Sequence, residues 1–121
     1  MDTELSYLSK HLPQYSLNPN TGFVTGADSN SFGGLQVLFS SIKGKANFIC
    51  YDIGLSNEQR DWCNANGLIL KDAQCLPVPK HINCWQTYCK PWIVTDSPFD
   101  YTIWIDTDCV VVELLPPPPI T

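Results

Sequence analysis

The feature that most constrains the fold is a regular alternation of strand-like and helical segments through the first half of the chain. The strand-like runs are rich in β-branched and aromatic residues, and the segments between them have apolar residues at helical spacing. The expected strands are 23–30, which runs on into a polar loop, 47–52 and 68–70, and the expected helices are 31–43 and 56–66. This order predicts an α/β fold with a mostly parallel sheet flanked by helices.

The boundaries of the two helices carry their own signals. Ser56 and Gln59 fit a capping box at the start of the second helix, and glycines end both helices at Gly44 and Gly67. Gly33 and Gly34 weaken the first turn of the first helix and permit close approach of the backbone to a strand or ligand. A strand, a polar loop and a helix in that order begin many nucleotide sites, but the glycine fingerprints of NAD-type and ATPase sites are missing.

Length and charge narrow the class of protein. The 121 residues suffice for one compact domain with a core, and 44% of them are hydrophobic. The net charge of −5 argues against sequence-independent nucleic-acid binding, which needs a basic face. No apolar run reaches the length of about 20 residues that a membrane span needs, and the N-terminus lacks the features of a signal peptide. We therefore expect a cytoplasmic domain without a membrane span.

The strongest chemical signal is a pair of carboxylates near the C-terminal end. Ile103, Trp104 and Ile105 have the composition of a buried strand, which we expect to be the central one, and Asp106 and Asp108 follow. In an extended chain the two aspartates point to the same side. Such a pair is suited to Mg²⁺ or Mn²⁺, with substrate phosphates as further ligands. The alternative is a solvated turn at a strand end.

Three other polar residues are candidates for the same site, each with a structural alternative. Asp28 and Asn30 follow the first strand, where either type also caps helices well. Lys90 lies in a predicted helix over 85–94, shortly before the acidic strand, and is a candidate for a diphosphate contact or a solvated lysine. The two histidines are weaker candidates for the site. His11 is expected to be solvated, and His81 is expected to lie in an irregular stretch over 71–83.

The six cysteines do not form a common zinc signature. Cys50 and Cys109 lie in apolar strand-like runs, and Cys63 lies in a helical pattern. Without a secretory signal, we expect buried free thiols in preference to a disulfide framework.

Taken together, three stretches resemble the nucleotide-binding half of glycosyltransferases with the GT-A fold, and most closely family eight, the glycogenin and lipopolysaccharide-galactosyltransferase group. They are Val24-Thr-Gly-Ala-Asp-Ser-Asn30 with the helix that follows, Lys90-Pro-Trp92, and Tyr101-Thr-Ile-Trp-Ile-Asp-Thr-Asp-Cys-Val-Val111. The likeness spans residues 23–113. It implies a Rossmann-like nucleotide-diphospho-sugar transferase fold.

The resemblance also implies roles for single residues. Asp106 would touch the ribose or the metal, and Asp108 would bind the Mn²⁺ or Mg²⁺ that bridges the diphosphate. Asp28 and Asn30 match positions that contact the base, usually uracil, so a UDP-sugar is the expected donor. Lys90 falls near a basic position that contacts phosphate or sugar.

The chain departs from that family at its C-terminal end. A complete GT-A enzyme continues well past the Asp-x-Asp strand, whereas here the last residues, 114–121, are half proline. We therefore expect a lead-in at 1–22, the α/β domain at 23–113 and a proline-rich tail. We also expect the chain to be a fragment or a degenerate transferase, inactive alone, that associates through exposed apolar surface.

Two other classes share parts of this pattern. A catalytically silent α/β binding or assembly module would have the same fold without ligand chemistry. Haloacid-dehalogenase-type phosphatases also carry Asp-x-Asp after an apolar strand, with the first aspartate as nucleophile. Their motif lies on the first strand, however, and here it comes last.

Overall fold

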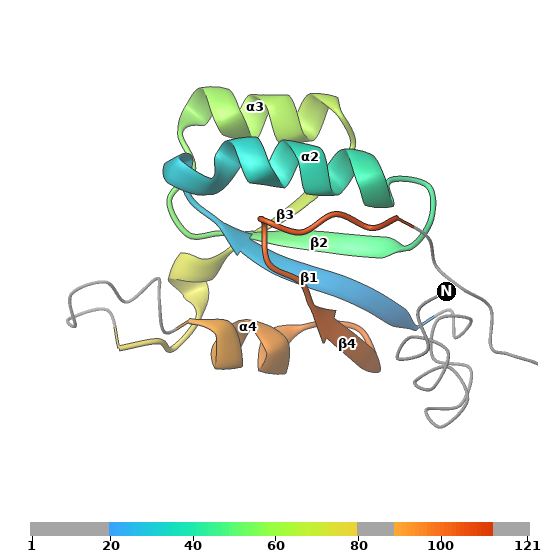
Figure 1. The fold of residues 1–121 in the computed structure, drawn as a ribbon. Helices are drawn as coiled ribbons and strands as arrows, with labels where there is room; N and C mark the ends of the chain where they lie inside the picture. The colour runs from blue at the N-terminus through green and yellow to red at the C-terminus, as the bar shows by residue number, and fades with distance from the viewer. Residues whose placement is uncertain (1–19, 80–88, 113–121) are drawn as a thin grey trace, which may run out of the picture.

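A computed structural model of the chain describes residues 20–79 and 89–112 (Figure 1). In chain order its elements are β1 (Thr21–Ala27), the 3₁₀ turn η2 (Ser29–Ser31), α2 (Phe32–Ile42), β2 (Asn47–Asp52), α3 (Asn57–Ala65), β3 (Ile69–Asp72), the 3₁₀ turn η3 (Ala73–Cys75), α4 (Lys90–Asp96) and β4 (Tyr101–Trp104). The predicted α/β class is confirmed. The calls at 1–19, 80–88 and 113–121, which include both histidines and the proline-rich tail, lie outside the described residues.

The four described strands form one parallel sheet in the order β3-β2-β1-β4. β1 pairs with β2 from Gly22 opposite Asn47 to Ala27 opposite Asp52, and on its other side with β4. The expectation that the acidic strand is central was therefore wrong, because β4 is an edge strand of the described sheet and β1 lies inside it. Strand order depends on which face each connection crosses, and composition does not encode that directly.

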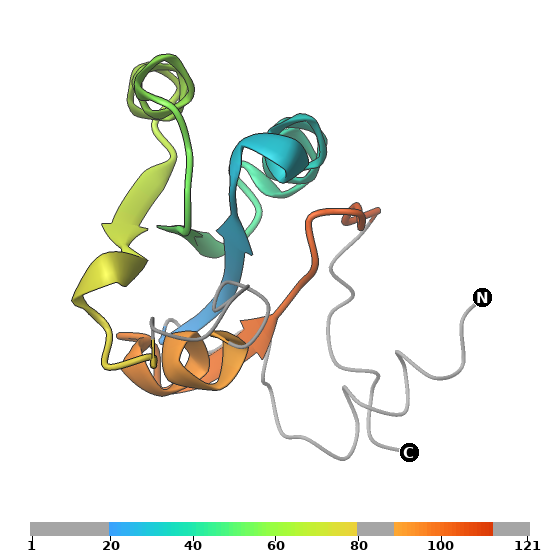
Figure 2. The ribbon, with the colours of Figure 1, turned by 90° about the vertical axis from the view of Figure 1, so that its left-hand side faces the viewer.

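Helices cover both faces of the sheet. α2 and α3 lie on one face, and α4 lies on the other, as two perpendicular views show (Figures 1 and 2). Alternate side chains of the inner strands enter two separate cores: Phe48 and Cys50 pack toward α2 and α3, while Ile49 and Tyr51 pack toward α4. This two-residue alternation lets apolar strands serve both cores, as parallel sheets require.

The predicted helix boundaries agree closely with the structure. Ser56 accepts a hydrogen bond from the amide of Gln59, whose side chain in turn accepts from the amide of Ser56, so the capping box is present. Gly44 and Gly67 adopt φ angles of +78° and +80° after the two helices, a region that favours glycine.

Two predicted boundaries moved. The stretch expected to be irregular from residue 71 begins as the end of β3 and continues as η3. The helix expected over 85–94 is described only from Lys90 and continues to Asp96, with Pro91 in its first turn, where its missing N–H costs little.

The described cysteines are free thiols. Cys50, Cys63 and Cys89 are buried, as expected, whereas Cys75 and Cys109 are exposed. Placing Cys109 in an apolar strand was wrong, because β4 ends at Trp104 and the chain turns before Cys109. Within the described ranges, no helix is long and apolar enough to cross a membrane.

Candidate functional site

The carboxyl ends of β1 and β4 define the candidate site. β1 connects through α2 to β2 on one side, whereas its neighbour on the other side is β4, reached only after the chain has crossed to the opposite face. Ligands of open α/β sheets bind outside the strand ends at such a reversal of strand order. Because β1 and β4 are parallel, the loops that carry Asp28 and Asp106 leave the sheet at the same edge.

The loop after β1 is held by its own hydrogen bonds. Asp28 Oδ1 accepts from the amide of Ser31 at 3.0 Å, and Ser31 Oγ accepts from the amide of Asp28 at 3.0 Å, so Asp28 caps η2. Ser29 donates to the carbonyl oxygen of Gly54 and to Gln59 Oε1, which ties this loop to the one after β2. The capping role of Asp28 is therefore present, and Asn30 is exposed beside it.

The segment after β4 is a tight turn, which we call the acidic turn (residues 106–109). The amide of Cys109 donates to the carbonyl oxygen of Asp106 at 3.1 Å. The expectation of an extended chain through Asp106 and Asp108 was wrong, so their side chains do not follow the alternation of a strand. Both carboxylates are exposed.

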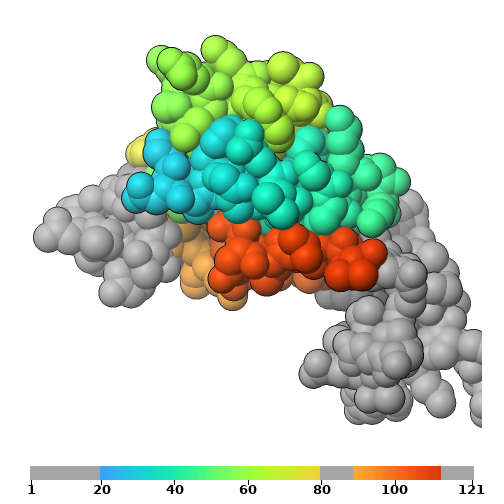
Figure 3. Space-filling model, turned by 45° about the horizontal axis from the view of Figure 1, so that its top comes forward, coloured from blue at the N-terminus to red at the C-terminus, as the bar shows by residue number. Residues whose placement is uncertain are grey.

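Close packing against α2 positions the acidic turn. A Cβ placed on Gly34 would lie only 2.5 Å from the carbonyl oxygen of Thr107, so the turn approaches a helix backbone that has no side chain there. Further on, the amide of Val111 donates to Ser41 Oγ at 2.8 Å. In Figure 3 the segment from Ile105 to Val112 (red) lies along α2 over its length.

Trp104 links the acidic turn to α4. Its indole Nε1–H donates to Asp106 Oδ1 at 2.6 Å, and Lys90 Nζ lies 5.3 Å from the centre of its ring. Two of the predicted site residues, one cationic and one anionic, therefore contact the same side chain. Asp28 and Asn30 follow β1 at the same edge of the sheet.

The acidic turn also contains a thiol, Cys109, whose Sγ donates to Asp108 Oδ1 at 3.6 Å. Partial loss of hydration, a hydrogen bond to Asp108 and the negative charge of Asp108 and Asp106 raise the pKa of Cys109. Mg²⁺ and Mn²⁺ prefer oxygen donors to thiolates, so the carboxylates of Asp106 and Asp108 are better donors for such an ion than Cys109 Sγ.

The carboxylates of Asp106 and Asp108 are the candidate ligands of a divalent cation. Among the described residues, no group of three or more His, Cys, Asp or Glu side chains is placed to hold a metal ion. Asp106 and Asp108 supply hard oxygen donors, the type that Mg²⁺ and Mn²⁺ prefer, and Mg²⁺ commonly takes one or two carboxylates and completes its shell with phosphate and water. The donor set fits an ion that arrives with a phosphate ligand, not one held by the protein alone.

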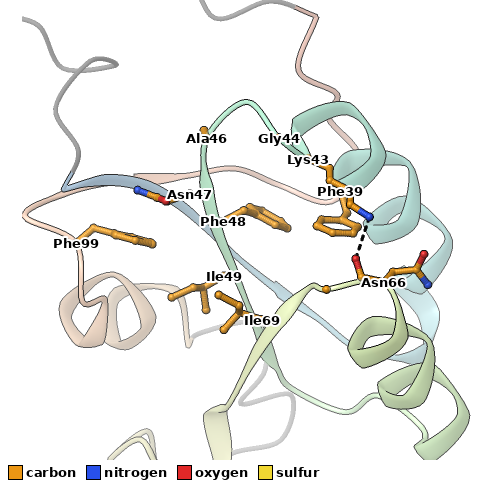
Figure 4. Close-up of a pocket in the computed structure, with 11 residues that line it drawn as sticks. Phe39, Lys43, Gly44, Ala46, Asn47, Phe48, Ile49, Asn66, Ile69 and Phe99 are labelled. Atoms are coloured by element: carbon orange, nitrogen blue, oxygen red, sulfur yellow. Dashed lines mark hydrogen bonds between the residues drawn. The ribbon is translucent and has the colours of Figure 1, made fainter.

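A separate pocket of about 310 Å³ lies at the opposite, amino end of the sheet (Figure 4). Its walls come mainly from apolar side chains, including Phe39, Phe48 and Phe99. Its charged lining residue, Lys43, donates to the carbonyl oxygen of Asn66 at 3.1 Å. This pocket contains none of the predicted site residues and offers little to a diphosphate.

Sequence reasoning missed the part that Trp104 plays. It was assigned only to the strand, because an aromatic residue there is explained by packing alone. An available signal was its position two residues before Asp106, because side chains two residues apart in an extended chain point to the same side. The predicted close approach at Gly34 does occur, but to the carbonyl of Thr107, not to a strand or ligand.

Comparisons with protein-family models, curated proteins and solved structures found no match to this chain.

Proposed function

We propose that this domain binds a nucleoside-diphosphate sugar of the UDP type together with Mn²⁺ or Mg²⁺, as the nucleotide-binding half of a GT-A glycosyltransferase. The observation that carries the proposal is the strand order β3-β2-β1-β4, all parallel. It places the polar loop after β1 and the acidic turn after β4 at the one edge where a ligand of such a sheet binds.

Each side chain has a task that its surroundings support. Asn30 and the exposed part of the loop at Asp28 contact the base, with the loop held by its hydrogen bonds to Gly54 and Gln59. Lys90, exposed at the start of α4, offers a positive charge to the diphosphate. The charge matters because the chain as a whole is acidic and repels a polyanion.

Asp106 and Asp108 would hold the divalent cation, which, when bound, stabilises the negative charge that develops on the diphosphate as the sugar leaves. Two features support this role: both carboxylates are exposed, and the turn that carries them packs closely against α2. Asp106 keeps one oxygen, Oδ2, beyond the one that Trp104 engages.

Thermal unfolding with UDP and Mn²⁺, added separately and together, tests the proposal. Stabilisation by both together should exceed the sum of the separate effects, because each ligand tightens binding of the other and a lower Kd raises the stabilisation, RT ln(1 + L/Kd) at free ligand concentration L. The D106N/D108N variant should lose the joint effect. D61N/D100N changes two other exposed aspartates by the same charge and should keep it.

The other classes give different results in the same assay. A chain whose unfolding ignores UDP and Mn²⁺ would be a binding or assembly module, and the proposal would then be wrong. Hydrolysis of a phosphate monoester that is lost in D106N would instead favour a phosphatase, in which Asp106 acts as nucleophile.

A further inference from the structure

Trp104 makes contacts on three sides that together determine where Asp106 lies. Its ring lies against the neighbouring strand β1. A Cβ placed on Gly26 of β1 would lie 3.6 Å from Cη2 of the indole. Ile93 of α4 and Ile53 surround the same point, at 3.3 Å and 3.5 Å from that Cβ position. The ring is therefore fixed by packing on the α4 face of the sheet.

The polar edge of this fixed ring faces the acidic turn. Nε1–H donates to Asp106 Oδ1 at 2.6 Å, a short bond of the kind made to an ionised acceptor. Asp106 is exposed, and an exposed carboxylate without such a bond samples several rotamers. Occupation of Oδ1 by the indole leaves Oδ2 as the oxygen directed to other partners.

The face of the same ring holds a positive charge. Lys90 Nζ lies 5.3 Å from the ring centre, within the range of a cation–π contact. Trp104 thus connects a cation on α4 to an anion on the turn after β4.

We infer that Trp104 is a positioning residue of the site, which holds Asp106 through one carboxylate oxygen so that the other is presented to the ligand. The inference about ligand binding rests on the proposed function, whereas the hold on Asp106 does not. It predicts that the indole N–H of Trp104 is bonded to Asp106 before any ligand is added. It also predicts that loss of this N–H alone weakens binding of UDP with Mn²⁺.

The first arm of the test needs no ligand. The indole N–H resonances of ¹⁵N-labelled protein report the four tryptophans, and the signal that W104F removes belongs to Trp104. D106N should shift this signal strongly, because it replaces the charged acceptor with a neutral amide. D108N is the matched control, since it removes the same charge two residues away and should move the signal much less. Equal shifts in the two variants, or none, would overturn the inference.

The second arm measures affinity for UDP in the presence of Mn²⁺. W104F keeps a ring in the same place but loses the N–H, and we expect about tenfold weaker binding, the size of one hydrogen bond to a charged group. W92F makes the same change on α4, where Trp92 packs on the same face of the sheet, and should bind within about twofold of the parent.

The outcomes separate the inference from the proposed function. If W104F and W92F bind equally well, Trp104 does not position Asp106 for binding and the inference fails. If the parent protein binds no UDP with Mn²⁺, the proposed function fails, and the ligand-free arm alone decides whether Trp104 holds Asp106.

Discussion

The two loops at the candidate site share one edge of the sheet but are held in opposite ways. The loop after β1 is held mainly by hydrogen bonds that its own residues make. Asp28 and Ser31 exchange hydrogen bonds, and Ser29 donates to the loop after β2. The acidic turn is held from outside, by Trp104, by the backbone at Gly34 and, further along, by Ser41. The carboxylate of Asp28 serves the structure of its own loop, whereas the carboxylates of Asp106 and Asp108 stay exposed to solvent.

The difference shows where a ligand can gain binding energy. An ionised carboxylate can accept about four hydrogen bonds. Asp28 Oδ1 already accepts from the amide and the hydroxyl of Ser31. Asp108 Oδ1 accepts a hydrogen bond at 3.6 Å from Cys109 Sγ, which is a weak donor. For the proposed ligand, we therefore expect the loop after β1 to supply shape and the acidic turn to supply charge. The following predictions test that division, from the largest expected effect to the smallest.

Removing Asp52 should cost the most stability. Its carboxylate, buried at the end of β2, accepts from the amides of Gly54 and Leu55 at 3.0 Å and 2.8 Å and pairs with Arg60. D52A leaves these donors without their acceptor, so we expect about 3 kcal/mol lower free energy of unfolding in urea. D61A on exposed α3 surface should change it by less than about 0.5 kcal/mol. Equal losses of stability in D52A and D61A would mean that the bonds of Asp52 do not hold the loop after β2, to which the loop after β1 is tied.

Acid should weaken the same region. Burial alone would raise the pKa of Asp52, but hydrogen bonds from Arg60 and two backbone amides outweigh it and lower the pKa. A carboxyl group whose pKa is lowered by folding adds stability above its unfolded pKa, and that stability is lost as the pH falls through the folded value. Urea unfolding between pH 7 and about pH 3 should therefore show a loss of stability that is smaller in D52N than in the parent and unchanged in D108N.

Asp28 and Asp106 should respond differently to the same truncation. D28A removes the cap of η2 and should lower the free energy of unfolding by about 1 kcal/mol. D106A removes an exposed carboxylate and should cost less than about 0.5 kcal/mol, while weakening binding of UDP with Mn²⁺. Chemical denaturation and calorimetric titration measure the two effects. The contrast between the loops is wrong if D106A destabilises the fold more than D28A does.

The smallest effect separates two neighbouring glycines of α2. Alanine at either position improves helix propensity by up to about 1 kcal/mol. Nothing lies within 4 Å of a Cβ at Gly33, so G33A should stabilise the fold, whereas at Gly34 the carbonyl of Thr107 must move. We expect G34A to be about 0.5 kcal/mol less stable than G33A and to bind UDP with Mn²⁺ less well. Identical behaviour of the pair would show that the turn is not seated on Gly34.

The elements were predictable because their signals are local. β2 matches its predicted range, and the capping box at Ser56 fixes the start of α3, since a cap depends on residues three positions apart. Glycines at positive φ ended both helices as expected. The parallel sheet followed from the alternation of strands and helices.

The rest depended on contacts between distant segments. The edge position of β4 results from the crossing to the α4 face, which no residue of the strand specifies. A turn at the strand end was the alternative to an extended chain, but the acidic turn contains neither glycine nor proline to favour it, and packing on α2 accompanies it. Asp28, Asn30, Asp106 and Asp108 do leave the same sheet edge, but their roles toward a ligand stay predictions.

The strand order also bears on how the chain reaches its structure. β1, β2 and β3 follow one another and pair in sequence, so they can assemble early during synthesis. β4 must instead return to Thr21 from Tyr101, across nearly all of the described chain, and such distant pairings form late. We expect β4 to join a sheet that already exists, so a newly made chain has the loop after β1 in place before it has its acidic turn.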